Sequence, residues 1–181
     1  MAQEDREINT REVDMKGYVT KQMKDILTLA DNYAKNNTTC KKTAVGCYLV
    51  NEDPNWRTVL AKGCNNSKES CKELGCLREQ LFGNNSKEHR TTCRCYGSHA
   101  EKDALLNVPP DQWNLLQGAT AFVTRYPCDF CASSLASAGI KRIVYGREFE
   151  MSDFAKEICE KEGIEVIHIA DWNCDENDTD N

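Results

Sequence analysis

The stretch AFVTRYPCDFCASSLASAGIKRIVYG, residues 121–146, decides the fold class of this chain. Its apolar start belongs to a predicted strand over residues 119–124, and its centre is a predicted helix over residues 128–138. Gly139 ends that helix, and the apolar run at residues 142–145 is the next predicted strand. A strand, a helix and a strand in this order favour a parallel pair of strands with the helix packed over them.

Similar patterns continue on both sides of this unit. Downstream, a predicted helix over residues 151–162 ends at Gly163, and a strand follows over residues 164–169. Upstream, the predicted elements are an amphipathic helix over residues 15–34, strands over residues 44–50 and 58–61 joined by a hairpin loop, and a helix over residues 99–106. The alternation predicts an α/β domain whose sheet is parallel at least in its second half, with helices packed over it.

The composition restricts the classes of function. With 181 residues, 40% of them hydrophobic and 29% charged, the chain suits one globular domain. We place this domain at residues 15–170, between a polar arm at residues 1–14 and an acidic tail at residues 171–181. The formal net charge of −6 argues against affinity for long nucleic acid. Because the sequence has no membrane-spanning apolar run and the arm has no apolar segment of a secretion signal, we expect a cytoplasmic protein without a membrane partner.

Cysteine is the strongest signal in the composition, with eleven residues. An odd number cannot pair completely, and disulfides are rare in a reducing compartment, so these cysteines favour metal binding. Residues 63–98 form a polar, cysteine-rich segment without a clear period, which a bound metal would hold together. Cys47, Cys159 and Cys174 are expected instead to pack as small apolar side chains.

Two short motifs carry the candidate chemistry. Cys128 and Cys131 follow Pro127 at the start of a helix, share one face of it, and lie where the helix dipole favours thiolates. His99 opens the preceding helix, so two thiolates and one imidazole supply three ligands for a tetrahedral Zn²⁺. The fourth position stays open for water, which is the arrangement of a catalytic zinc site. Glu101, two residues beyond the imidazole, is the candidate proton shuttle.

H-A-E at residues 99–101 and P-C-x-x-C at residues 127–131 together match the signature of zinc-dependent nucleobase deaminases. Within that group the chain resembles the deoxycytidylate (dCMP) deaminases, which carry a strand, helix and turn similar to residues 121–146. Three further segments resemble the same family: CKKTAVGCYLV at residues 40–50, CKELGCLREQ at residues 71–80 and KEHR at residues 87–90. The similarity covers residues 26–169. It implies a cytidine-deaminase-like fold, a three-layer α-β-α sandwich with a central five-stranded mixed sheet and a cysteine-rich insert after the second strand.

The resemblance also implies a reaction. A zinc-activated hydroxide attacks C4 of the cytosine of dCMP, while Glu101 moves protons from the water to N3 and to the departing ammonia. The product, dUMP, is a precursor for thymidylate synthesis. By their positions in the family's motifs, the substrate residues are Asn65 near the deoxyribose, the Ala100 backbone at the pyrimidine edge, Tyr126 beside the ring and Lys42 at the phosphate. From the residues alone, Asn65 also fits a plain turn, Lys42 a surface charge and Tyr126 core packing.

The resemblance accounts for further cysteines as well. Many family members hold a second, structural zinc that ties the first strand to the insert. The matching positions here, the last two being alternatives to Cys95, are Cys40, Cys71, Cys93, Cys95, His89 and Cys76. Members also form homo-oligomers from dimers to hexamers and often bind allosteric dCTP or dTTP with Mg²⁺. The chain departs from the family's G-Y-N-G motif, which reads GCNN at residues 63–66, and it has Asp103 where members usually have Asn.

Three alternatives stay open. A tRNA adenosine deaminase would share the fold and both motifs, but Phe130, Ser133 and the acidic balance depart from its usual P-C-x-M-C-A-G-A phrase. A free cytidine or guanine deaminase would differ mainly in lacking a phosphate site. A zinc-stabilised binding module without activity would have no use for the carboxylate of Glu101, so this residue favours an enzyme.

Overall fold

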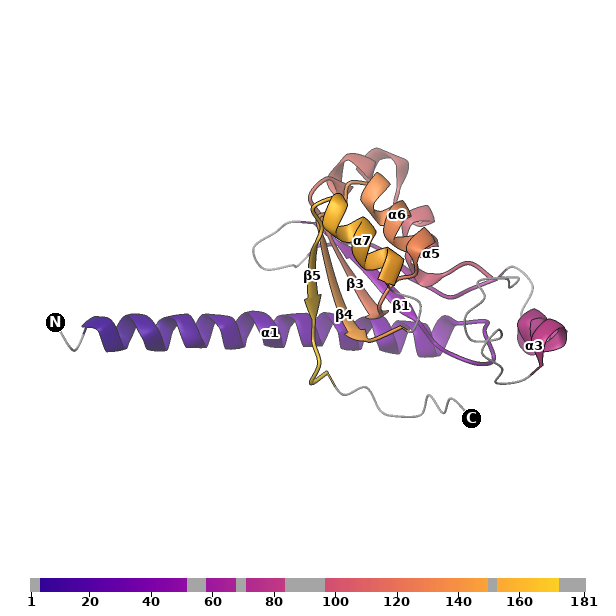
Figure 1. Ribbon diagram of the computed structural model, residues 1–181, viewed down its shortest axis with the longest axis horizontal. Coiled ribbons are helices and arrows are strands. Elements are labelled where there is room, and N and C mark those ends of the chain that lie inside the picture. The colour runs from indigo at the N-terminus through magenta and orange to yellow at the C-terminus, as the bar shows by residue number, and fades with distance from the viewer. Residues whose placement is uncertain (1–3, 52–57, 68–70, 84–96, 150–152, 173–181) are drawn as a thin grey trace.

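Five strands among the described residues form one mixed sheet in the order β2-β1-β3-β4-β5 (Figure 1). The strands are β1 (Gly46–Val50), β2 (Val59–Cys64), β3 (Thr120–Arg125), β4 (Arg142–Arg147) and β5 (Glu165–His168). β1 is antiparallel to both of its neighbours, whereas β3, β4 and β5 run parallel to one another. The computed structural model describes residues 4–51, 58–67, 71–83, 97–149 and 153–172.

Helices cover both faces of this sheet (Figure 1). α1 (Glu4–Asn37) crosses one face, and α5 (Ala100–Leu106), α6 (Asp129–Ser137) and α7 (Asp153–Lys161) cover the other. The shorter helices are α2 (Cys71–Leu74), α3 (Leu77–Phe82) and the 3-10 helix η1 (Pro110–Leu116). The predicted three-layer α-β-α sandwich with a five-stranded mixed sheet is therefore confirmed.

The two cores follow from the alternation of side chains along the strands. On β1, Cys47 and Leu49 face α5, α6 and α7, whereas Tyr48 faces α1. Because both faces of the sheet are covered, β1 is buried throughout its length. Cys159 of α7 lies in the same core as Cys47, which confirms that both thiols pack as apolar side chains. Cys174 lies outside the described residues.

The largest differences from the predicted elements lie at three places. α1 begins at Glu4, so most of the predicted arm at residues 1–14 is helical, although it has no apolar period to reveal this. β2 continues to Cys64 because Gly63 is buried there against α5, and the cysteine-rich insert therefore begins after this strand. η1 starts at Pro110, since proline suits the first position of a helix as well as the end of one.

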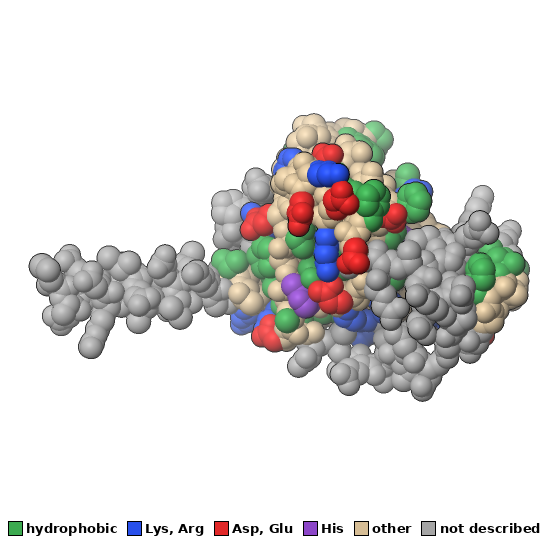
Figure 2. Space-filling view, viewed as in Figure 1, with side chains coloured by type: hydrophobic (Ala, Val, Ile, Leu, Met, Phe, Trp, Pro, Cys, Tyr) green, Lys and Arg blue, Asp and Glu red, His purple; other side chains and the backbone are tan. Residues whose placement is uncertain are grey.

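Acidic and basic side chains are interspersed over the region of α7 and β5 on the face shown in Figure 2. The described part of this face therefore presents no single-sign field of the kind that attracts a polyanion. Among the described residues, no helix is both long and apolar enough to cross a bilayer.

Candidate metal centre

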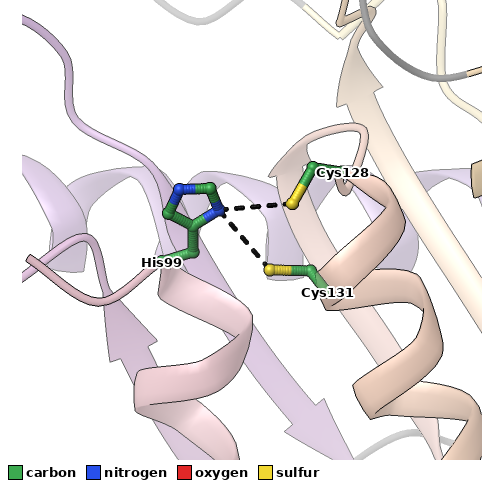
Figure 3. A group of neighbouring side chains, drawn as sticks. All are labelled: His99, Cys128 and Cys131. Carbon is green, nitrogen blue, oxygen red and sulfur yellow. Dashed lines mark hydrogen bonds between the residues drawn. The ribbon is translucent and has the colours of Figure 1, made fainter. Parts of the chain in front are cut away.

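Three donor side chains converge between the N-terminal ends of α5 and α6 (Figure 3). His99 is the N-cap residue of α5, Cys128 is the N-cap residue of α6, and Cys131 lies in the first turn of α6. The Nδ1 atom of His99 lies 3.5 Å from the Sγ atom of Cys128 and 3.5 Å from the Sγ atom of Cys131. Within the part of the chain that the structure describes, no other group of three His, Cys, Asp or Glu donors lies close enough to share a metal ion.

The spacing of these donors fits a tetrahedral zinc ion. Zinc–nitrogen bonds of about 2.0–2.1 Å and zinc–sulfur bonds of about 2.3 Å place the two donor atoms about 3.6 Å apart at tetrahedral angles. Hydrogen bonding to Cys128 and burial raise the pKa of Cys131, so this thiol becomes a thiolate only beside a positive charge. The three donors leave one tetrahedral position for water, as a catalytic site requires.

Two contacts between α5 and β2 hold His99 in place. Gly63 packs so closely against the first turn of α5 that a Cβ atom there would lie 2.3 Å from the backbone oxygen of Ala100. The carboxylate of Asp103 accepts a hydrogen bond of 3.0 Å from the backbone N–H of Cys64. These contacts fix the helix on the sheet, and the helix in turn fixes the imidazole at its N-terminal end.

Glu101 lies beside the three donors and is 3% exposed. Burial raises the pKa of Glu101, while the neighbouring imidazole of His99 lowers it in part. A carboxyl group whose pKa is raised exchanges its proton more readily near neutral pH, as a proton shuttle must. Hydrogen bonding to Cys128 raises the pKa of His99, against burial and the charge of Arg78, which act to lower it.

A cavity of ≈ 120 Å³ opens beside these side chains. Of the predicted substrate residues, Asn65, Ala100 and Tyr126 line it. Lys42 is not among the lining residues, and its Nζ atom lies 3.5 Å from the Oε1 atom of Glu79 in an ion pair. The structure thus brings three of the four predicted substrate residues to the metal centre.

The side chain of Asn65 is largely engaged within the protein. Its amide donates to the backbone oxygen of Thr43 at 2.8 Å, and its oxygen accepts from the Thr38 hydroxyl and the Val45 N–H, both at 2.9 Å. These bonds clamp the segment before β1 against the end of β2. Because a primary amide has two N–H donors, one of them is left for a ligand.

The ring of Tyr126 forms part of the cavity wall, and its hydroxyl is directed into the core. The hydroxyl donates a hydrogen bond of 3.7 Å to the Sγ atom of Cys159. The ring also packs edge-on against Tyr145, with centroids 4.7 Å apart. Tyr126 therefore offers an apolar ring surface to a ligand, and its hydroxyl serves packing.

The predicted ligands of a second zinc lie only partly within the described residues. Cys40, Cys71 and Cys76 line the same cavity. The Sγ atom of Cys40 accepts a hydrogen bond of 3.5 Å from the backbone N–H of Lys42. Outside the described residues lie His89, Cys93 and Cys95.

Sequence reasoning missed further polar residues that line the cavity, among them Thr43, Arg78, Ser98 and Arg125. None of them belongs to a metal-ligand or acid–base motif, so no spacing rule selects them. Two signals were nevertheless present. Arg78 lies in the segment CLRE that resembles the deaminase family, and Arg125 ends the strand that leads into the Tyr-Pro-Cys turn.

Residues 20–147 match the cytidine and deoxycytidylate deaminase zinc-binding region. The chain is 31% identical over 142 residues to ComE operon protein 2 of Bacillus subtilis (strain 168), covering 73% of this chain and 63% of that protein. It is 32% identical over 118 residues to the deoxycytidylate deaminase of Mycobacterium phage D29, covering 64% of this chain and 87% of that enzyme. The chain thus spans slightly less than two thirds of the first of these relatives.

The fold is similar to that of the dCMP deaminase from the cyanophage S-TIM5, whose crystal structure was determined in complex with dCMP and dUMP. The TM-score is 0.56 at 22% sequence identity, covering 80% of this chain and 94% of that chain. At this identity the likeness bears on the fold alone.

Proposed function

Because this chain belongs to the cytidine and deoxycytidylate deaminase zinc-binding family, we propose that it hydrolyses dCMP to dUMP and ammonia in a zinc-dependent reaction. The observation that carries the proposal is the cluster of His99, Cys128 and Cys131 beside the buried carboxyl group of Glu101. The relative from Mycobacterium phage D29, which is named a deoxycytidylate deaminase, supports the nucleotide substrate. The reaction would supply dUMP for thymidylate synthesis.

In this proposal His99, Cys128 and Cys131 hold the zinc ion. Bound zinc supplies a Lewis acid that lowers the pKa of a coordinated water towards about 7. Glu101 takes a proton from the attacking water and gives it to N3 of the pyrimidine. It then carries the second proton to the exocyclic nitrogen as the C4–N bond breaks, so that ammonia leaves and a C4 carbonyl forms.

Three cavity residues orient the substrate in the same proposal. The Ala100 backbone faces the amide edge of the pyrimidine, and the ring of Tyr126 packs beside the base. The remaining amide N–H of Asn65 contacts the deoxyribose. The positions of all three on the cavity wall support these roles.

We further propose a second, structural zinc held by Cys40, Cys71, Cys93 and Cys95, with His89 or Cys76 as alternatives to Cys95. The presence of Cys40, Cys71 and Cys76 in the lining of one cavity supports this proposal. A metal at this place would tie the segment before β1 to the insert that contains α2 and α3.

A homo-oligomer is part of the proposal, from a dimer to a hexamer. Large apolar side chains on the outer helices support it, because Leu106 is 74% exposed, Phe130 is 72% exposed and Phe154 is 59% exposed. Exposed apolar side chains of this size are typical of subunit contacts. Light scattering on the purified protein in solution would give the mass of the assembly. A mass equal to that of one chain would contradict the proposed homo-oligomer.

A panel of substrates tests the function. Zinc-loaded protein is incubated with dCMP, CMP, dCTP, deoxycytidine and a tRNA anticodon stem-loop, and the ultraviolet change from amino to keto base is followed. We expect dCMP to give the highest kcat/KM. Turnover of the stem-loop alone would assign a tRNA adenosine deaminase, and turnover of deoxycytidine alone would assign a nucleoside deaminase. Zinc-loaded protein without any turnover would be a binding module.

A further inference from the structure

Two arginine side chains are among the residues that line the cavity. Arg78 comes from α3, and Arg125 is the last residue of β3. Among the described residues that line the cavity, Glu101 is the sole acidic one. Two guanidinium groups thus face one carboxyl group among the described lining residues, in a chain whose formal net charge is −6. This contrast indicates an anionic group in the ligand.

Three polar atoms of the same cavity are buried and have no hydrogen-bond partner among the described residues. They are the Nε atom of Arg125, the Oγ1 atom of Thr43 and the Oγ atom of Ser98. Buried polar atoms are nearly always paired, and an unpaired one destabilises the protein. Three of them in one cavity indicate a ligand with several acceptor oxygens.

The nearby lysines are engaged elsewhere. The Nζ atoms of Lys41 and Lys42 lie 3.0 and 3.5 Å from the carboxylate of Glu79 on α3. Arg78 precedes Glu79 on this helix and lines the cavity. Arg78 and Arg125 are thus the Lys or Arg residues among the described side chains that line the cavity.

We propose that Arg78 and Arg125, together with the hydroxyl groups of Thr43 and Ser98, bind the 5′-phosphate of the nucleotide substrate. This inference rests on the proposed function and adds the residues that select a nucleotide over a nucleoside. A phosphate dianion balances two guanidinium groups and accepts several hydrogen bonds at once. Arg125 leads directly into the turn with Tyr126, so the phosphate and the base are held from one short segment.

The experiment measures the affinity of zinc-loaded protein for dUMP, deoxyuridine and inorganic phosphate by titration calorimetry. We expect dUMP to bind the parent protein at least tenfold more tightly than deoxyuridine, and phosphate to compete with dUMP. Arg125→Gln and Arg78→Gln should each weaken dUMP binding about 10- to 100-fold and leave deoxyuridine binding unchanged. Arg125→Lys, which keeps the charge, should recover part of the loss.

The control variant is Arg142→Gln, because Arg142 pairs with Glu165 outside the cavity. It should bind all three ligands as the parent does. Equal affinity of the parent for dUMP and deoxyuridine would overturn the phosphate site, and so would an equal loss of both ligands in Arg125→Gln. A parent that binds dUMP through Arg125 but does not deaminate dCMP would overturn the proposed reaction and keep the phosphate site. A parent that deaminates dCMP and deoxycytidine with the same kcat/KM would overturn the phosphate site and keep deamination as the reaction.

Discussion

Glu101 is the residue on which the proposed chemistry depends most directly. It is buried on the first turn of α5, two residues beyond His99, and its environment raises its pKa. A carboxyl group in this position can take up and release protons while it stays beside the three metal-donor side chains. No other described carboxyl group lines the cavity, so no neighbour can replace it.

Glu101→Gln should give a folded, zinc-loaded and nearly inactive protein. The amide keeps the size of the side chain and leaves all three metal donors, but it cannot transfer protons. We expect kcat to fall about 10²–10⁴-fold or more, because the residue serves several proton transfers. Deamination assays and elemental analysis for zinc measure the two quantities. Lys102→Gln, on the exposed side of the same helix, is the control. A loss of kcat of less than tenfold in Glu101→Gln would show that Glu101 is not the proton shuttle.

At the scale of elements, the contact between α5 and β2 positions the metal donor His99. A Cβ atom on Gly63 would lie 2.2 Å from the backbone N of Ala104 and 2.3 Å from the backbone O of Ala100. Backbone atoms of a helix cannot move aside singly, so the whole of α5 would have to shift. The position of the imidazole therefore depends on a residue that carries no functional group.

Gly63→Ala should lower both stability and activity. The added methyl group forces α5 away from β2, and overpacking of this kind costs about 1–3 kcal/mol. Because His99 moves with the helix, zinc affinity and kcat should fall as well. Gly83→Ala is the comparison, since no atom lies within 4 Å of a Cβ atom there and only its φ of 75° is strained. Urea unfolding and zinc content check this, and a Gly63→Ala protein with normal zinc content and kcat would show that α5 is not the positioning element.

The cysteine-rich insert has few apolar side chains to hold it on the domain. Helix α3 has no buried residue, and Leu81 is 55% exposed. The described contacts between the insert and the first strand include the ion pairs of Lys41 and Lys42 with Glu79. Surface ion pairs contribute little to stability, so a metal is the stronger candidate for the link.

Cys71→Ser should lower the zinc content from two ions per chain to one and reduce stability before it affects chemistry. The reason is that a structural zinc site forms only in the folded chain and so contributes folding free energy. The variant should also be cleaved faster by proteases between residues 64 and 98. Cys159→Ser, in the core under α7, should keep both ions. One zinc per chain in the parent, with Cys71→Ser as stable as the parent, would mean that the insert is held in some other way.

The sequence predicted the elements that carry an apolar period and missed contacts made through backbone or polar atoms. The strand, helix and turn at residues 121–146 were predicted correctly, since apolar runs and Gly139 mark their limits. The end of β2 was missed because Gly63 is buried by close packing of its backbone. Glycine has no side chain, so it adds nothing to the apolar pattern that predicts a strand. The metal donors follow from motif spacing, whereas Arg125 has no motif and meets the cavity only through the fold.

At the scale of the whole molecule, the sheet separates the site from a second, purely structural layer. The metal donors and Glu101 lie on α5 and α6, and α1 packs on the opposite face. The buried carboxylate of Asp31 on α1 accepts a hydrogen bond of 2.8 Å from Arg147 of β4 and lies 2.8 Å from the Nζ atom of Lys35. Because the residues that line the cavity include none from the part of α1 whose side chains are described, this layer should contribute to stability without taking part in chemistry.

Asp31→Ala should therefore lower the free energy of unfolding and leave kcat unchanged for the folded fraction. Removal of the carboxylate breaks its hydrogen bond with the guanidinium of Arg147, and a hydrogen bond between charged groups contributes about 1.5–3 kcal/mol. Urea unfolding followed by circular dichroism measures the loss, and deamination assays below the unfolding midpoint measure kcat. Glu157→Ala is the control, because the ion pair of Glu157 with Lys161 is exposed and should contribute less than about 1 kcal/mol. If Asp31→Ala lowered kcat while zinc content stayed at the parent's level, the sheet would be transmitting the change from α1 to the metal centre, and the two layers would not be independent.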